Sequence, residues 1–97
     1  MAELRWAESA VKDLEQICDY IAKDSEIYAK VFARRVIDTL EATATFPYSG
    51  RMVPEMKNEI IREKILTNHR LIYRIQEESI EVIRIIQSAK DFKDIDK

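Results

Sequence analysis

The hydrophobic positions follow two different periods along the chain. Apolar residues recur at helical spacing from Ala7 to about Asp24 and again from Ser25 to about Thr45, which predicts two amphipathic helices. Asp24-Ser25 offers the N-cap of the second helix, and the proline of Phe46-Pro47 ends it. Because the join between them is very short, the two helices should form an antiparallel hairpin.

After the Pro/Gly turn at Pro47–Arg51 the apolar period changes to two, as in strands. Three strands are expected at Ile60–Leu66, Arg70–Gln76 and Ile80–Gln87, and a short first strand at residues 3–7. The pattern predicts an α+β fold in the order β-α-α-β-β-β, with the short N-terminal strand and the αα-hairpin packed on one face of a small antiparallel sheet. Residues 1–97 should form a single domain.

The strand register divides the side chains between two faces. A two-residue loop at Glu77-Glu78 pairs Tyr73 with Val82, although a longer loop is also compatible, since neither glutamate readily adopts positive φ. We expect a three-residue loop at Asn68, because a two-residue loop would turn Arg62 and Lys64 inward and bury unpaired charges. The face toward the helices then holds Ile61, Ile65, Leu71, Tyr73, Ile75, Ile80, Val82 and Ile86. The wider core should include Trp6, Leu14, Ile17, Ile21, Phe32, Val36 and Leu40.

The second face then carries cations among aliphatic side chains. Its predicted members are Arg62, Lys64, Arg70, Ile72, Arg74, Glu81, Ile83, Ile85 and Gln87. A plain solvated face, with Arg74–Glu81 as a cross-strand pair, would also explain the alternation. However, Ile72, Ile83 and Ile85 would then be exposed to solvent. A mixed apolar and cationic patch is typical of a surface that binds a partner. We therefore expect a docking surface.

Composition and charge limit the classes of protein to which this chain can belong. Hydrophobic residues make up 46% and charged residues 35%, as in a soluble globular protein. The net charge of −2 and a pI near 5.5 argue against a direct nucleic-acid binder, although residues 51–74 carry six Lys/Arg against three Asp/Glu. With no membrane-spanning apolar run and no signal-type N-terminus, the protein should be cytoplasmic. One cysteine and one histidine at unrelated positions predict no metal site, and no cofactor is expected.

Four segments resemble the RelE/ParE toxin superfamily in the family's own order. LRWAESAVKDLEQICDYIAKDS is similar to its opening strand and A-x-x-D-L-x-x-I-x-x-Y-I helix, and FPYSGRMVPE to its F-P-x-x-G-R-x-V-P-E turn. IIREKILTNHRLIYRI resembles its strand pair and IEVIRIIQSAKD its closing strand. The resemblance spans nearly the whole chain. Ala7 departs from the family, which commonly places a helix-capping serine there, so either Ser9 takes over or the cap is absent.

The resemblance implies a bacterial toxin of a type II toxin–antitoxin system, with roles such as plasmid stabilisation. A cognate antitoxin would keep it inactive by covering apolar surface with a C-terminal helix or an added strand. Two activities divide the superfamily: the RelE-like branch cleaves mRNA at the ribosome, and the ParE-like branch inhibits DNA gyrase without recognised catalytic residues. Neither implies a membrane partner or sequence-specific DNA binding by this chain.

The candidate residues favour binding over catalysis. Arg62 matches the arginine that stabilises phosphate in the nuclease branch, but Gln87 stands where a histidine is common, and an amide transfers no proton near neutral pH. A ribonuclease would depend on Glu55, Arg62, Lys64 and Lys90, whereas a binder would contact its target through Arg62, Arg70, Arg74, Gln87 and Lys90. We expect a ParE-like gyrase inhibitor. The alternatives are a RelE-like ribosome-dependent mRNA endonuclease and a non-toxic, antitoxin-binding relic.

Overall fold

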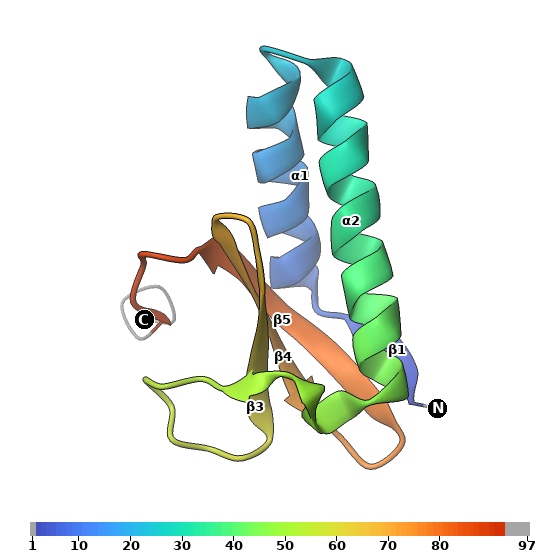
Figure 1. The fold of residues 1–97 in the computed structure, drawn as a ribbon, viewed down its shortest axis with the longest axis vertical. Coiled ribbons are helices and arrows are strands. Elements are labelled where there is room, and N and C mark those ends of the chain that lie inside the picture. The colour runs from blue at the N-terminus through green and yellow to red at the C-terminus, as the bar shows by residue number, and fades with distance from the viewer. Residues whose placement is uncertain (1, 93–97) are drawn as a thin grey trace.

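A computed structural model describes residues 2–92 and confirms the predicted β-α-α-β-β-β order, with one further short strand (Figure 1). The elements are β1 (Glu3–Trp6), α1 (Glu8–Ala22), α2 (Glu26–Thr45), the 3₁₀ turn η1 (Pro47–Ser49), β2 (Arg51–Met52), β3 (Ile61–Leu66), β4 (His69–Ile75) and β5 (Ser79–Gln87). The sheet order is β1-β5-β4-β3-β2. The sheet is mixed rather than antiparallel throughout, because β1 runs parallel to β5.

The two helices stand side by side and extend beyond the sheet at the end away from η1 (Figure 1). The Ser25 hydroxyl caps α2 by accepting the N–H of Tyr28 at 3.0 Å. Ala7 occupies the N-cap of α1 without a side-chain bond, and Ser9 instead donates its hydroxyl to the backbone carbonyl of Ile83 at 2.7 Å. The first helix therefore lacks a side-chain cap, one of the two predicted outcomes. No helix in residues 2–92 combines the length and apolarity needed to cross a membrane.

The main core lies between the helices and strands β4 and β5. Its buried members include Ala10, Phe32, Val36, Leu40, Leu71, Val82 and Ile85, and Tyr73 and Ile80 form an adjoining buried cluster. Trp6, Leu14, Ile17 and Ile21 pack against it partly buried. The core predicted from helical and strand periodicity is thus confirmed, apart from the positions discussed next.

The loop between β3 and β4 holds two residues, Thr67 and Asn68, and the predicted three-residue loop is wrong. Thr67 has a φ of 54°, and positive φ at the first loop position is the feature of a type II′ turn. In this register Arg62 lies opposite Tyr73, and Lys64 opposite Leu71, so both cations belong to the helix-side face. The two cations are not buried on this face, because the helices pack over β1, β4 and β5, and only the Leu66 end of β3 reaches the core beneath them.

A β-bulge in β5 reverses the predicted faces of Ile85 and Ile86. Tyr73 pairs with Val82 but Ile72 pairs with Arg84, so Ile83 has no partner on β4. An extra residue reverses the alternation beyond it. As a result Ile85 packs under the helices and Ile86 faces away from them, the opposite of our assignment. The two-residue loop at residues 77–78, by contrast, is confirmed.

The second sheet face carries its own small core, so the predicted open platform is wrong. Ile61, Ile72 and Ile86 from three strands pack with Val53 and Phe92, and Met56 and Ile83 lie against them. Val53 and Met56 belong to the segment between β2 and β3, and Phe92 follows β5. The second core thus covers Ile72 and Ile83, two of the isoleucines that the sequence predicted to be exposed, and the third, Ile85, packs under the helices. Ile65, predicted to be core, is 50% exposed.

Candidate functional site

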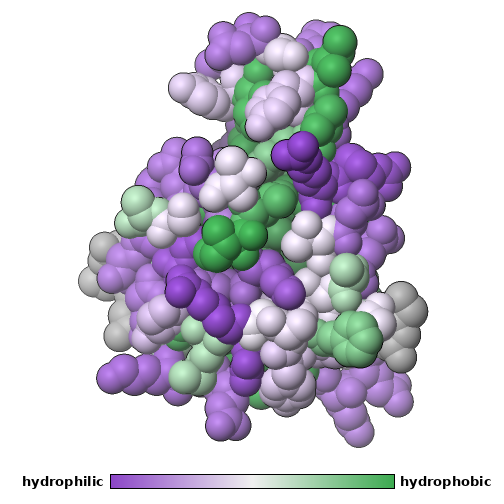
Figure 2. Space-filling view, viewed as in Figure 1, coloured by the Kyte–Doolittle hydropathy of each residue, from purple (hydrophilic) through white to green (hydrophobic). Residues whose placement is uncertain are grey.

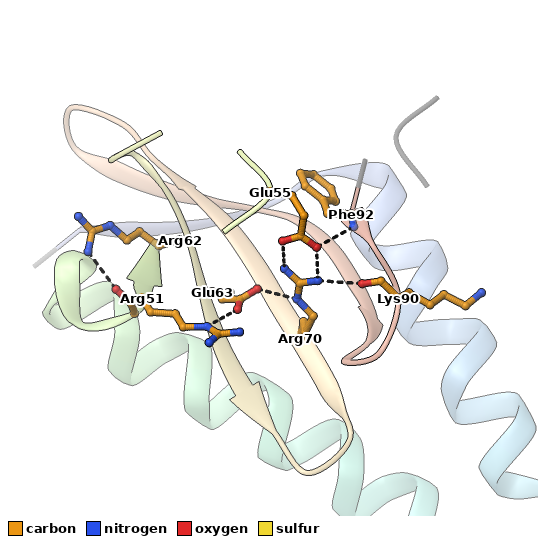
Figure 3. A network of polar contacts seen from close by, with 8 residues as sticks. Arg51, Glu55, Arg62, Glu63, Arg70, Lys90 and Phe92 are labelled. Carbon is orange, nitrogen blue, oxygen red and sulfur yellow. Dashed lines mark hydrogen bonds and ion pairs between the residues drawn. The ribbon is translucent and has the colours of Figure 1, made fainter. Parts of the chain in front are cut away.

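Arg70, predicted on an open surface, is buried beneath this second core with 4% of its surface exposed. Its Nε donates to Glu63 Oε1, and its two terminal nitrogens donate to the two carboxylate oxygens of Glu55, each at 2.7 Å (Figure 3). One of them also donates to the backbone carbonyl of Lys90 at 2.8 Å. Arg70 therefore offers no nitrogen to an outside partner in this structure.

Two carboxylates balance the buried guanidinium. The side chain of Glu63 is fully buried and also accepts from Arg51 Nε on the edge strand β2 (Figure 3). Glu55 accepts the backbone N–H of Phe92 at 3.1 Å. The hydrogen bonds from Arg70 are the main cause that lowers the pKa of Glu55 to about 2, and the same carboxylates raise the pKa of Arg70. The network ties the segment after β2 and the residues after β5 to the sheet.

Arg62 lies on the other, helix-side face, at the edge that the helices leave uncovered. Its Nε donates to the backbone carbonyl of Glu59 at 2.7 Å, and its Nη1 to that of Gly50 at 3.1 Å. The guanidinium carbon lies 5.0 Å from the centre of the Tyr48 ring, a cation–π distance. Within residues 2–92 no carboxylate pairs with it, in contrast to Arg70. Arg62 is thus held by neutral groups and keeps its charge available.

The other predicted contact residues lie apart from one another. Arg74 is exposed on the second face and pairs with Glu81 at 3.1 Å, as predicted. Lys64 is half-buried on the helix-side face. Gln87 and Lys90 are exposed and line a groove at the far end of the sheet. The predicted contact set therefore does not form one surface.

That groove has a volume of about 570 Å³ and lies between the helical hairpin and the ends of β4 and β5. Ile17, Tyr20, Ile21, Tyr28 and Phe32 supply its apolar lining, and two of them are well exposed, Tyr20 at 73% and Tyr28 at 48%. Green and pale side chains in the middle of Figure 2 mark apolar surface between the helices and the sheet. This groove was not predicted from the sequence, although a tyrosine outside the helical core stripe is a signal that could have indicated it.

His69 closes the groove at the start of β4. Its ring meets Phe32 edge to face with centroids 5.1 Å apart, and burial lowers its pKa. Its Nδ1 is buried and has no hydrogen-bond partner among residues 2–92. The same described range holds no cluster of three or more side chains that could bind a metal ion. The histidine is therefore a packing residue of the groove wall.

The residues that a ribonuclease would need do not meet. Glu55 lies with Arg70 on the second face, whereas Arg62 and Lys64 belong to the helix-side face of the same sheet. The Lys90 side chain borders the groove, and only its backbone carbonyl joins the Arg70 network. The arrangement can present charge and apolar surface to a partner, but it does not place a carboxylate and the two β3 cations around one phosphate.

Comparisons with known proteins identify the family. The family model described as the ParE toxin of the type II toxin–antitoxin system parDE matches residues 4–92. Toxin RelE2 of Caulobacter vibrioides is 26% identical over 90 residues, which are 93% of this chain and 99% of that protein.

Solved structures share the fold. A chain of the chromosomal ParDE system from P. aeruginosa aligns with a TM-score of 0.74 at 20% identity, covering 90% of this chain and 96% of its own. A chain of the E. coli DinJ–YafQ complex aligns with a TM-score of 0.58 at 16% identity, covering 95% and 99%. Because the family model matches nearly the whole chain, the protein belongs to the ParE toxin family of type II toxin–antitoxin systems, within the RelE/ParE superfamily.

Proposed function

We propose that this toxin acts by binding DNA gyrase and inhibiting it, without catalysing a reaction, and that a cognate antitoxin neutralises it. The match to the ParE family model supports the choice of target, since gyrase inhibition is what resemblance to the ParE-like branch implies. Binding requires an accessible charged and apolar surface but no proton transfer.

The separation of the candidate catalytic residues carries this proposal. Cleaving RNA through its 2′-hydroxyl needs a base, an acid and cations around one phosphate. Glu55 is a poor base near neutral pH, because its pKa is about 2 and both of its oxygens accept bonds from Arg70. It also lies across the sheet from Arg62 and Lys64. Gln87, at the end of β5, transfers no proton.

One observation favours a second candidate function, a RelE-like ribosome-dependent mRNA endonuclease. A relative that aligns over 93% of this chain is named Toxin RelE2. Arg62 would then be the residue that stabilises the phosphate, and it is free of carboxylate partners in residues 2–92. This function predicts cleavage of ribosome-bound mRNA, and Arg62→Ala should abolish the cleavage.

A plasmid-supercoiling assay with purified gyrase tests the proposed function. Wild-type toxin should stop supercoiling, while a translation reaction in a bacterial extract continues at the same toxin concentration. Cleaved mRNA with undisturbed supercoiling would instead establish the endonuclease. Colony counts after expression of the toxin alone test the non-toxic relic, because a relic leaves the counts equal to those of an empty vector.

We infer that the antitoxin binds as an amphipathic helix in the groove beside α1. The apolar lining and the exposed Tyr20 and Tyr28 support this, since a helix laid in a groove uses large apolar anchors. Replacing both tyrosines by alanine should weaken capture of the cognate antitoxin by at least about tenfold, as expected for interface anchors. Arg35→Ala, an exposed change on α2, is the matched control. Equal capture by the tyrosine variant and the control would exclude this groove.

A further inference from the structure

We infer that the toxin contacts its target through a patch around Arg62, and that the target presents an acidic and apolar protein surface there. The Arg62 patch consists of Phe46, Tyr48, Met52, Ile60, Arg62 and Lys64. The inference rests on the proposed function in assuming action by binding, but it does not depend on gyrase being the target.

The strand register gathers these side chains on one surface. Arg62 and Lys64 alternate along β3 and share its helix-side face, Ile60 directly precedes the strand, and Met52 on β2 is the cross-strand partner of Arg62. The Tyr48 ring lies against the Arg62 guanidinium, and Phe46 precedes it by two residues at the end of α2. The lower part of Figure 2, over β3 and η1, shows dark purple side chains beside pale and green ones.

The apolar members of the patch are exposed to an unusual degree. Phe46 is 70% exposed, Tyr48 60%, Met52 40% and Ile60 39%. Among the described residues, the contact with Arg62 is the only ring or polar contact of the Tyr48 side chain. On the opposite face of the same sheet, by contrast, the second core covers its aliphatic side chains, including Ile61 of β3. A cluster that stays uncovered and surrounds a cation is typical of an interface.

The backbone beneath the patch is fixed before any partner arrives. The Tyr73 hydroxyl accepts the N–H of Gly50 at 3.1 Å and donates to the carbonyl of Pro47 at 2.6 Å, which pins both ends of the turn carrying Tyr48. Gly50 in turn holds the Arg62 guanidinium through its carbonyl. Side chains that are already positioned lose less entropy on binding, so the aromatic ring and guanidinium are suited to act as anchors.

The chemistry of the patch favours an acidic protein partner over a nucleic acid. Arg62 and Lys64 have no carboxylate partner within residues 2–92, so a protein that supplies carboxylates would form ion pairs with both cations. Aromatic residues, Met and Arg are the types enriched at the cores of protein interfaces and in their hot spots. A phosphate backbone would leave Phe46, Met52 and Ile60 against a polar surface. The net charge of −2 also gives the chain no general attraction to a polyanion.

Direct binding measurements test the inference on the full chain. Immobilised toxin is titrated with purified gyrase, with a short labelled peptide of alternating Glu and Leu, and with a labelled single-stranded oligonucleotide. Arg62→Glu and Tyr48→Ala should each weaken gyrase and peptide binding by at least about tenfold, as interface anchors do. Arg35→Glu, the same charge change at an exposed position of α2, should leave both unchanged. Because Arg62 also holds two backbone carbonyls, Tyr48→Ala provides a variant that leaves those bonds intact.

The outcomes separate this inference from the proposed function. Gyrase bound equally by wild type and both patch variants would overturn the patch and leave the proposed function standing. Failure to bind gyrase, together with patch-dependent binding of the peptide, would overturn the proposed function and support the patch. If the wild-type toxin binds neither gyrase nor the peptide, the proposed function and the Arg62 patch are both overturned. The toxin could instead bind the oligonucleotide in preference to gyrase and the peptide, through the Arg62 patch and with a steep dependence on salt. That result overturns the inference that the partner is a protein.

Discussion

Replacing Arg70 by methionine should destabilise the protein strongly. The change removes three charge-assisted hydrogen bonds to carboxylates and one to a backbone carbonyl. Among the described residues, Glu63, whose side chain is fully buried, is left with the bond from Arg51. Glu55 is 17% exposed and keeps the backbone N–H groups of Phe92 and of Glu55 itself. The variant therefore leaves a fully buried carboxylate with one cationic partner in place of two and releases the two segments that cover the second sheet face.

The expected loss in free energy of unfolding is about 3–5 kcal/mol, the usual effect of breaking a buried ion pair by removing one partner. This is a large share of the roughly 5–15 kcal/mol that stabilises an ordinary domain. Since the urea dependence of a small protein is about 1–3 kcal/mol per molar, the unfolding midpoint should fall by roughly 1–5 M. Arg74→Met is the matched control. It breaks an exposed pair with Glu81, worth about 0–1 kcal/mol.

Urea unfolding followed by fluorescence of the single tryptophan, Trp6, measures both losses, because this residue packs partly buried against the main core. Combining Arg70→Met with Glu63→Leu should cost less than Arg70→Met alone, since the buried carboxylate leaves together with its partner. If Arg70→Met costs no more stability than Arg74→Met, or if Glu63→Leu adds its own loss, the buried network does not stabilise the fold.

Three further changes test other parts of the structure. The pKa of Glu55 falls from 4.5 to about 2 on folding, so its ionised form contributes fully to the free energy of unfolding above about pH 4.5 and loses that contribution toward pH 2. Glu55→Gln should therefore reduce the loss of stability between pH 4.5 and pH 2, measured by unfolding at several pH values. An unchanged loss contradicts the lowered pKa of Glu55. Gly50→Ala should cost about 1–3 kcal/mol in thermal unfolding, because the new methyl group would lie 2.5 Å from the Tyr73 hydroxyl; an unchanged melting temperature contradicts this. Asp13→Ala should speed amide hydrogen exchange at Ile85, whose N–H the carboxylate accepts at 2.9 Å, and unaltered exchange would show that α1 does not cap β5.

Local patterns predicted most of the fold correctly. The helical stripes, the cap at Ser25 and the proline after Phe46 each follow from short-range sterics and hydrogen bonding, so the observed helices agree with the prediction. The turn at residues 77–78 and the pairing of Tyr73 with Val82 also depend on neighbours a few residues apart. A resemblance in four short segments was enough to indicate the family that the whole-chain comparison confirms.

The candidate site was predicted less well, because Arg62 and Lys64 were assigned to the wrong face. Thr67-Asn68 lacks the glycine that usually signals a two-residue hairpin, and Thr67 adopts positive φ although a β-branched residue rarely does. A slip of one residue moves every side chain of a strand to the other face. Arg62 therefore moved to the helix-side face, and the mixed cationic and apolar patch lies on the side opposite to the one predicted.

The sequence by itself determined the elements, the main core and the family, since periodicity, capping and turn chemistry act over a few residues. Only the tertiary structure decided which arginine stays accessible to a partner and which is buried in an ion-pair network. Arg70 is buried because Glu55 and Glu63, 15 and 7 residues earlier, reach it together, and Arg62 stays accessible because the helices end short of β3. Whether a charge can be buried depends on the partners that the fold brings to it, and a strand pattern contains no information about those partners.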